Sequence, residues 1–149
     1  MTTPVLSTAD VLVVEDDPGD VLLTTDALED CHLGLSLHVV GDGEEAMRFL
    51  RSAGQQRPAL VLLDLNLPRR GGLEVLADLK ADPDLRAIPV VVLTTSQAEA
   101  DIARSYELHA NAYVIKPIDA AKFADAIKQI DEFFLILMRQ PQYAPRLAS

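Results

Sequence analysis

The sequence has little of several residue types that mark particular classes of protein. Its single cysteine, Cys31, can support neither an internal disulfide framework nor a cysteine metal site, and this composition fits a reducing compartment. Basic residues are few, because 13 Lys and Arg stand against 23 Asp and Glu, for a formal net charge of −10. A nucleic-acid-binding surface needs clustered Lys and Arg, so we do not expect nucleic acid as a partner.

Long apolar segments are also missing. No apolar run approaches the ~20 residues that span a bilayer, and the N-terminus lacks the basic and apolar regions of a signal peptide. We therefore expect a cytoplasmic protein with no membrane partner. The 149 residues, of which 49% are hydrophobic, fit one domain with a substantial core.

Short apolar runs, several of them rich in β-branched residues, alternate with segments of helical periodicity. The expected strands lie at about 10–15, 35–40, 59–64, 89–94 and 112–116. The expected helices lie at about 18–31, 43–53, 72–81, 98–109 and 119–138. Five such βα units with right-handed crossovers predict an α/β fold, a doubly wound parallel sheet with helices on both faces.

Residues that favour helix starts precede four of these helices. Asp17 can cap the first helix, in which Pro18 at the first position loses no needed hydrogen bond. Asp42 and Asp119 can cap the second and fifth helices, and Ser96 can cap the fourth. These caps predict where the connecting loops end.

Four of the five expected strands, those at 10–15, 59–64, 89–94 and 112–116, end at charged or hydroxyl residues that can take part in phosphate chemistry. Ligands bind outside the carboxyl ends of parallel strands, so these side chains should share one crevice. There Glu15, Asp16 and Asp64 would bring like charges together, at roughly 4 kcal/mol per pair for ~4 Å and a dielectric of about 20. A divalent cation would relieve that repulsion, and Mg²⁺ prefers carboxylate oxygens. With Thr94 and Lys116 alongside, the site suits phosphoryl transfer through an aspartyl phosphate.

Four motifs in this order resemble the receiver domain of two-component response regulators. They are Val13-Val14-Glu15-Asp16-Asp17, Leu62-Leu63-Asp64-Leu65-Asn66-Leu67-Pro68, Val92-Leu93-Thr94-Thr95-Ser96 and Tyr113-Val114-Ile115-Lys116-Pro117. The resemblance covers residues 8–130 and implies the flavodoxin-like (βα)5 fold with strand order 2-1-3-4-5. Residues 131–149 would form an extension of the last helix and a tail.

The resemblance implies a phosphorylation site with a bound metal. Asp64 would accept a phosphoryl group from a histidine of a sensor kinase. Asp16, Asp64 and the backbone carbonyl of Asn66 would bind Mg²⁺ directly, and Glu15 would bind it through water. Beyond magnesium-dependent self-phosphorylation and self-dephosphorylation, no enzyme activity is expected.

Further residues would sense the phosphoryl group. Lys116 would pair with it, Thr94 would donate a hydrogen bond to it, and Tyr113 would rotate inward behind Thr94. The bond between Lys116 and Pro117 is expected to be cis. Taken alone, Thr94 could reflect only β-propensity, and Tyr113 could be a plain core aromatic.

Three segments, including one near the end of the chain, resemble one subgroup of this family more closely. Residues 15–20, 93–96 and 133–135 are similar to those of stand-alone regulators that partner bacterial phytochromes, in which an extended last helix commonly supports a homodimer. Residues 133–138 are all apolar, so one side of the helix can pack on the sheet while the other needs another partner. The core-facing side is expected to contain Phe123, Ile127, Ile130, Phe134 and Leu137.

These observations favour a single-domain response regulator, downstream of a bacteriophytochrome, that acts through protein contacts. Two alternatives stay open: a phosphate sink in a relay, and a receiver fold that binds partners without phosphorylation. A phosphatase of the haloacid dehalogenase type is disfavoured. Its nucleophile ends the first strand and is followed two residues later by a second Asp, whereas Asp64 ends the third expected strand and is followed by Asn66.

Overall fold

Five strands and five helices alternate along the computed structural model, which describes residues 9–31, 35–52 and 57–138. The strands are β1 (Ala9–Val14), β2 (Leu35–Val40), β3 (Leu60–Leu63), β4 (Val90–Thr94) and β5 (Ala112–Ile115). The helices are α1 (Pro18–Cys31), α2 (Gly43–Ser52), α3 (Gly72–Ala81), α4 (Glu99–Glu107) and α5 (Ala120–Met138). The expected alternation is confirmed, with small shifts at the ends of elements.

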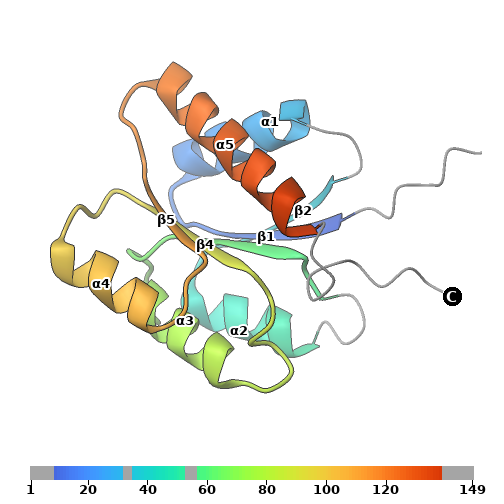
Figure 1. Cartoon of the computed structure of the whole chain (residues 1–149), viewed down its shortest axis with the longest axis vertical. Coiled ribbons are helices and arrows are strands. Elements are labelled where there is room, and N and C mark those ends of the chain that lie inside the picture. The colour runs from blue at the N-terminus through green and yellow to red at the C-terminus, as the bar shows by residue number, and fades with distance from the viewer. Residues whose placement is uncertain (1–8, 32–34, 53–56, 139–149) are drawn as a thin grey trace, which may run out of the picture.

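The strands form one parallel sheet in the order β2-β1-β3-β4-β5, which confirms the flavodoxin-like fold. Helices α1 and α5 cover one face of the sheet, and α2, α3 and α4 cover the other (Figure 1). Some expected positions lie outside the described residues. They are residue 8 of the expected domain, residue 53 of the second expected helix, and residues 139–149 of the expected extension and tail.

The core is divided between the two faces because side chains alternate along a strand. In β1, Leu12 and Val14 face the cluster under α2 and α3, whereas Val11 and Val13 face the cluster under α1 and α5. Burial on both faces explains why β3, and β4 up to its last residue Thr94, are apolar rather than alternating. The sheet is therefore a rigid support for the residues that follow its strands.

Three of the four expected helix caps are confirmed. Asp17 accepts a hydrogen bond from the Gly19 amide, Asp42 from the Glu45 amide, and Asp119 from the amides of residues 121 and 122. These bonds satisfy backbone donors that the first helical turn leaves without partners.

The cap expected at Ser96 is wrong. Helix α4 begins at Glu99, and its cap position is Ala98, which has no side-chain cap. The hydroxyl of Ser96 instead donates to Asp101 Oδ2 at 2.6 Å and accepts from the Ala98 amide at 3.3 Å. Ser96 therefore shapes the loop before the helix.

Helix α5 has the expected core-facing side. Phe123, Ile127, Ile130 and Phe134 are buried in the cluster under α1 and α5, whereas the side chain of Leu137 lies outside the described residues. On the other side of the same helix, Leu135 is 40% exposed and Ile136 is 57% exposed. Among the helices in the described part of the chain, none is long and apolar enough to cross a membrane.

Candidate functional site

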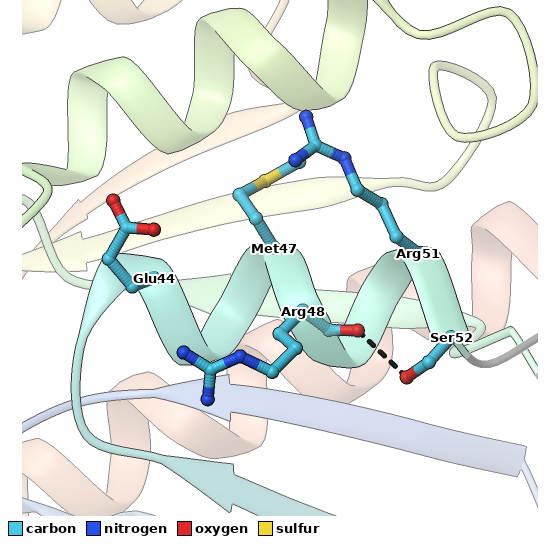
Figure 2. A pocket seen from close by; sticks show the side chains of 5 residues that line it. All are labelled: Glu44, Met47, Arg48, Arg51 and Ser52. Carbon is cyan, nitrogen blue, oxygen red and sulfur yellow. Dashed lines mark hydrogen bonds between the residues drawn. The ribbon is translucent and has the colours of Figure 1, made fainter.

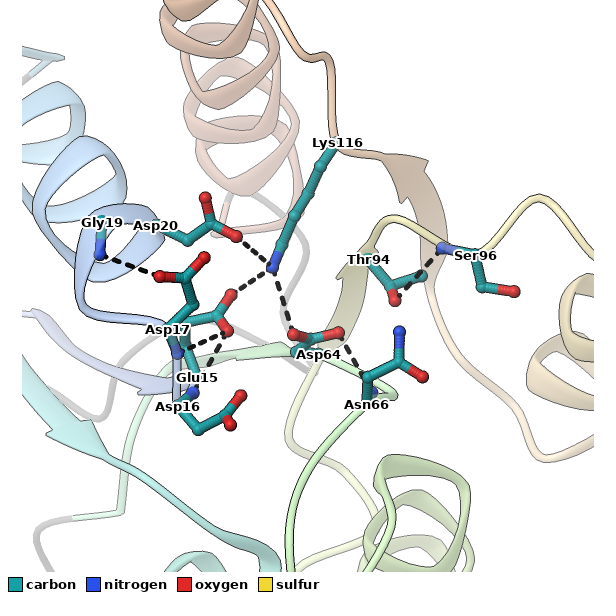
Figure 3. A network of polar contacts seen from close by, with 10 residues as sticks. All are labelled: Glu15, Asp16, Asp17, Gly19, Asp20, Asp64, Asn66, Thr94, Ser96 and Lys116. Atoms are coloured by element: carbon teal, nitrogen blue, oxygen red, sulfur yellow. Dashed lines mark hydrogen bonds and ion pairs between the residues drawn. The ribbon is translucent and has the colours of Figure 1, made fainter.

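The expected site residues meet at one edge of the sheet, where the parallel strands end (Figure 3). Glu15 and Asp16 follow β1, Asp64 follows β3, Thr94 is the last residue of β4, and Lys116 follows β5. Parallel pairing in register brings these strand ends together, although the residues are far apart in the sequence.

Lys116 is the centre of the polar network. Its ammonium group lies 3.1 Å from Asp64 Oδ2 and forms a second ion pair with Glu15 Oε1. All three residues are buried, with Lys116 only 7% exposed and Asp64 only 6% exposed. Buried charges need partners of the opposite sign, so this lysine and these carboxylates hold one another at the edge of the sheet.

Backbone amides complete the hydrogen bonds of the carboxylates. Glu15 Oε2 accepts from the amides of Asp16 at 3.1 Å and Asp17 at 3.2 Å, and these bonds fix the turn after β1. Asp64 Oδ1 accepts from the amide of Asn66 at 3.1 Å. The second oxygen of Asp64 faces Lys116, so the carboxylate has a fixed orientation.

The three acidic residues can hold a divalent cation together. Glu15, Asp16 and Asp64 each offer a carboxylate oxygen, and these oxygens lie within 4.8 Å of one another. Asp16 is exposed, so a cation can reach the group from solvent, whereas the other two are buried. Hard divalent cations such as Mg²⁺ and Mn²⁺ bind such oxygen sets, so the donor chemistry fits a metal.

The network shifts the pKa values of its members. Burial raises the pKa of Glu15 and Lys116 lowers it; together with the raising effect of the neighbouring Asp64, the net result is a pKa of about 7. Burial would also raise the pKa of Asp64, but hydrogen bonds from Glu15 and the Asn66 amide and the charge of Lys116 outweigh it and lower that pKa. Asp64 is therefore the carboxylate that keeps its negative charge.

Lys116 stays charged despite its burial. Burial alone would lower the pKa of this lysine, but the bonds to Glu15 and Asp20 and the charge of Asp64 raise it above its ordinary value. A permanent positive charge beside Asp64 is what an incoming phosphoryl group requires, since its oxygens carry negative charge.

Thr94 and Tyr113 occupy the edge of the site near β4. Thr94 is fully buried, and its Oγ1 accepts a long hydrogen bond of 3.5 Å from the Ser96 amide. The hydroxyl of Tyr113 donates to the Ser96 backbone carbonyl at 2.9 Å. Both residues therefore contact the loop between β4 and α4, and the inward rotation of Tyr113 stays a prediction.

One residue of the network was not assigned a role from the sequence. Asp20 Oδ2 lies 2.9 Å from the Lys116 ammonium, so a third carboxylate shares this lysine. The available signal was its place in the first turn of α1, directly after the acidic turn of residues 15–17. A helix that starts at this edge of the sheet directs its first turn toward the other strand ends.

The expectation of a cis bond between Lys116 and Pro117 is wrong. Lys116 and Pro117 are both described residues, and no peptide bond between described residues is cis. The trans isomer is intrinsically favoured for X–Pro bonds by about 0.5–1 kcal/mol. The Lys116 side chain reaches the acidic residues from this trans backbone.

A separate hollow of about 380 Å³ lies along α2 (Figure 2). It is lined by Glu44, Met47, Arg48, Arg51 and Ser52. None of these residues belongs to the acidic network. The candidate functional site is therefore the acidic network at the strand ends and not this hollow.

Comparison with known proteins connects this geometry to a family. Residues 11–128 match the response regulator receiver domain. Response regulator Rcp1 of Synechocystis sp. is 42% identical over 135 residues, which cover 88% of this chain and 92% of that protein. A crystal structure of the Mn(2+)-bound form of Rcp1 has a TM-score of 0.80 at 43% identity and covers 85% of this chain and 94% of that one.

Two further solved structures are similar over most of the chain. The phosphorylated cyanobacterial phytochrome response regulator RcpA has a TM-score of 0.82 at 44% identity, and the match covers 87% of this chain and 95% of that one. The bacteriophytochrome response regulator AtBRR has a TM-score of 0.67 at 45% identity, and the match covers 84% of this chain and 94% of that one. The chain therefore belongs to the response regulator receiver domain family, whose members are signalling proteins and not classical enzymes.

Proposed function

We propose that this protein is a single-domain response regulator that accepts a phosphoryl group on Asp64 from a sensor histidine kinase. The observation that carries the proposal is the set of charged groups around the Asp64 carboxylate. This carboxylate lies 3.1 Å from the Lys116 ammonium, and it belongs to a group with the carboxylates of Glu15 and Asp16 whose oxygens lie within 4.8 Å of one another. A nucleophilic carboxylate that is next to a fixed cation and also belongs to a potential metal site suits phosphoryl transfer.

The transfer follows from the charges of the site. An oxygen of the ionised Asp64 attacks the phosphorus of a phosphohistidine, and the new O–P bond forms as the N–P bond breaks. The imidazole keeps the electron pair of the broken bond and takes up a proton. Lys116 stabilises the negative charge of the phosphoryl oxygens, and Thr94, beside Asp64, is placed to donate a hydrogen bond to them.

Mg²⁺ is the metal that we propose for this site. Asp16 and Asp64 would bind it directly with the backbone carbonyl of Asn66, and Glu15 would bind it through water. The proximity of the three carboxylates supports this assignment, and so does the Mn(2+)-bound structure of the similar protein Rcp1. When bound, the metal offsets charge on the phosphoryl group and on Asp64.

We further propose a bacterial phytochrome as the kinase partner. The supporting observation is the similarity, at more than 40% identity, to the phytochrome response regulators RcpA and AtBRR. Exposed apolar residues suitable for protein contact occur near the site: Ile118 is fully exposed two residues after Lys116, and Leu22 is exposed in α1.

Signalling would run through protein contacts of residues 8–130, and the extension from residue 131 would support a homodimer. The exposed Leu135 and Ile136 on α5 support this part of the proposal, because both lie outside the core that the same helix helps to form. A phosphate sink and a binding-only receiver remain the alternatives. The buried Asp64, Lys116 and Thr94 favour phosphorylation over binding alone.

The direct test is to incubate the protein with Mg²⁺ and acetyl phosphate and to measure its intact mass. We expect a labile mass increase of one phosphoryl group in the wild type and none in Asp64→Asn, which keeps the size of the side chain. A wild-type mass that never increases would reject phosphorylation and leave the binding-only alternative.

A further inference from the structure

The loop of residues 64–71, which we call the β3–α3 loop, carries two of the residues assigned to the metal site. It folds back on itself, because the Asn66 amide donates to Asp64 Oδ1 at 3.1 Å and the Gly72 amide donates to the Leu65 carbonyl at 3.0 Å. Any displacement of this loop therefore moves the acceptor carboxylate and the Asn66 backbone together.

Two glycines let helices approach this loop closely. A Cβ atom at Gly72, the first residue of α3, would lie only 2.3 Å from the backbone oxygen of Asp64. A Cβ atom at Gly43, the first residue of α2, would lie 2.2 Å from the backbone oxygen of Arg70. Both ends of the β3–α3 loop thus pack directly against the starts of helices.

The side chain of Arg70 ties the loop to both helices. Its Nε lies 3.1 Å from Glu44 Oε1 in the first turn of α2, and its Nη1 forms an ion pair with Asp78 Oδ2 in α3. Figure 2 shows Glu44 at the start of α2, away from the arginines of the hollow. The guanidinium fork can bind two carboxylates at once, which a single ammonium group does less well.

The neighbouring Arg69 makes a much weaker connection. Its side chain is 73% exposed, and its Nε is 3.6 Å from Asp42 Oδ2. The side chain of Arg70 is only 24% exposed, so it is the more firmly held of the two. Of the two adjacent arginines in this loop, Arg70 therefore carries the connection between the helices.

We propose that Arg70 is a positioning residue of the acidic site: by holding the β3–α3 loop between α2 and α3, it sets where Asp64 and the Asn66 carbonyl stand relative to the cation. This inference rests on the function proposed above, in which that carbonyl binds the metal. Arg70 itself touches neither the metal nor the phosphoryl group. Its effect passes through the backbone of the loop.

Simple electrostatics predicts the opposite sign for a mutation here. Removing a positive charge from an acidic protein makes its field more attractive to a cation, so Arg70→Ala would bind a divalent metal more tightly. Loss of positioning would make the same variant bind the metal more weakly. The direction of the change therefore separates the two effects.

Arg104→Ala is the charge-matched control. Arg104 pairs with Glu107 within α4, and its side chain is 54% exposed, so the variant loses the same charge and a similar type of contact. It leaves the β3–α3 loop intact. A general effect of the lost positive charge should have the same sign in both variants.

The first measurement is hydrogen exchange of the metal-free protein. Arg70→Ala should speed exchange at the Asn66 and Gly72 amides, whose acceptors lie within the loop, and Arg104→Ala should not. The second is Mn²⁺ and Mg²⁺ binding by calorimetry. Here Arg70→Ala should raise the dissociation constant by ~10-fold, the low end of the 10–100-fold loss typical of residues that support metal ligands. Arg104→Ala should leave it unchanged or lower it.

Two partner variants make the test independent of the arginine itself. Glu44→Gln and Asp78→Asn each remove one ion pair of Arg70, and each should speed exchange at the loop amides by less than Arg70→Ala. Combining both should speed loop exchange about as much as Arg70→Ala does, because both ion pairs of Arg70 are then lost. If Arg70→Ala does not fold, as judged by circular dichroism, hydrogen exchange of the double variant decides the question instead, because the loss of two carboxylate charges would by itself weaken metal binding.

The outcomes separate this inference from the proposed function. With acetyl phosphate and saturating Mg²⁺, Arg70→Ala should be phosphorylated at nearly the wild-type rate, but half-saturation should need several-fold more Mg²⁺. Unchanged loop exchange together with unchanged or tighter metal binding in Arg70→Ala overturns the positioning role. A wild type that is never phosphorylated overturns the proposed function, while the exchange data still decide whether Arg70 holds the loop.

Discussion

The Lys116 ammonium lies 3.1 Å from the Asp64 carboxylate, although 52 positions separate the two residues in the sequence. Lys116 follows β5 at one edge of the sheet, and Asp64 follows the central strand β3. The length of the lysine side chain spans β4 between them. The same ammonium also binds Glu15 and Asp20, so one cation balances three carboxylates.

Replacing this lysine should destabilise the metal-free protein. In Lys116→Met the carboxylates of Glu15 and Asp64 stay buried without their cation, and breaking a buried ion pair in this way costs about 3 kcal/mol or more. Urea denaturation should therefore give a lower free energy of unfolding. Added Mg²⁺ should stabilise this variant more than it stabilises the wild type, because the metal replaces the missing charge. Equal stability of both proteins without metal would contradict the role of Lys116.

Metal affinity should depend on pH through Glu15. Burial raises the pKa of Glu15 to about 7, so the metal-free protein keeps this proton below that pH. A cation favours the ionised carboxylate, so binding releases the proton, and affinity falls as pH drops below 7, by up to about tenfold per unit. Above that pH the affinity should level off.

Calorimetry at a series of pH values checks this dependence, and Glu15→Gln is the matched control. The glutamine cannot ionise, so its affinity should be lower and should lack the change in slope near pH 7. The same slope in both proteins would assign the titration to another group.

The two adjacent glycines before and at the start of α3 should respond differently to alanine. At Gly72 a Cβ would overlap the backbone oxygen of Asp64, whereas at Gly71 a Cβ meets no atom within 4 Å. Gly72→Ala should lower the free energy of unfolding by about 1–3 kcal/mol and slow phosphorylation of Asp64. Gly71→Ala should stay within about 0.5 kcal/mol of wild type. Similar behaviour of the two variants, by urea denaturation and phosphorylation rate, would argue against this close approach.

An interface on α5 should be sensitive to charge at its exposed apolar residues. Ile136→Asp should lower the mass measured by light scattering from that of a dimer to that of a monomer. Tyr106→Asp, at an exposed aromatic residue of α4, is the control and should leave the dimer intact. Phe134 is unsuitable for this test, because it is buried and its replacement would cost core stability of about 3–5 kcal/mol. A wild-type monomer, or a dimer unaffected by Ile136→Asp, would reject the interface.

Most of the fold could be predicted because each element has a local signal. The buried parallel strands β3 and β4 are apolar at every position before the site residues that end them, and caps such as Asp17 and Asp42 mark helix starts directly. The resemblance of the motifs to receiver domains then supplied the strand order, which local patterns do not determine. The strand ends in turn predicted that Glu15, Asp16, Asp64 and Lys116 would meet.

The misses at Ser96, Asp20 and Arg70 have a common physical cause, which is that contacts with other residues of the fold decide their roles rather than local preference. Ser96 is a good cap by residue type, but its hydroxyl binds Asp101, and α4 begins three residues later. Asp20 reaches Lys116 because the first turn of α1 faces the strand ends. Arg70 binds both Glu44 and Asp78 because the fold brings α2 and α3 together. None of these contacts leaves a pattern in the surrounding sequence.

The most direct test of the central claim is to identify the phosphorylated atom. The protein is incubated with Mg²⁺ and acetyl phosphate, reduced with borohydride, which converts an aspartyl phosphate to homoserine, and analysed by peptide mass spectrometry. The account predicts homoserine in place of Asp64 and nowhere else, and none when Mg²⁺ is removed by a chelator. Phosphorylation of a different residue, or a product at Asp64 that forms equally without the metal, would contradict it.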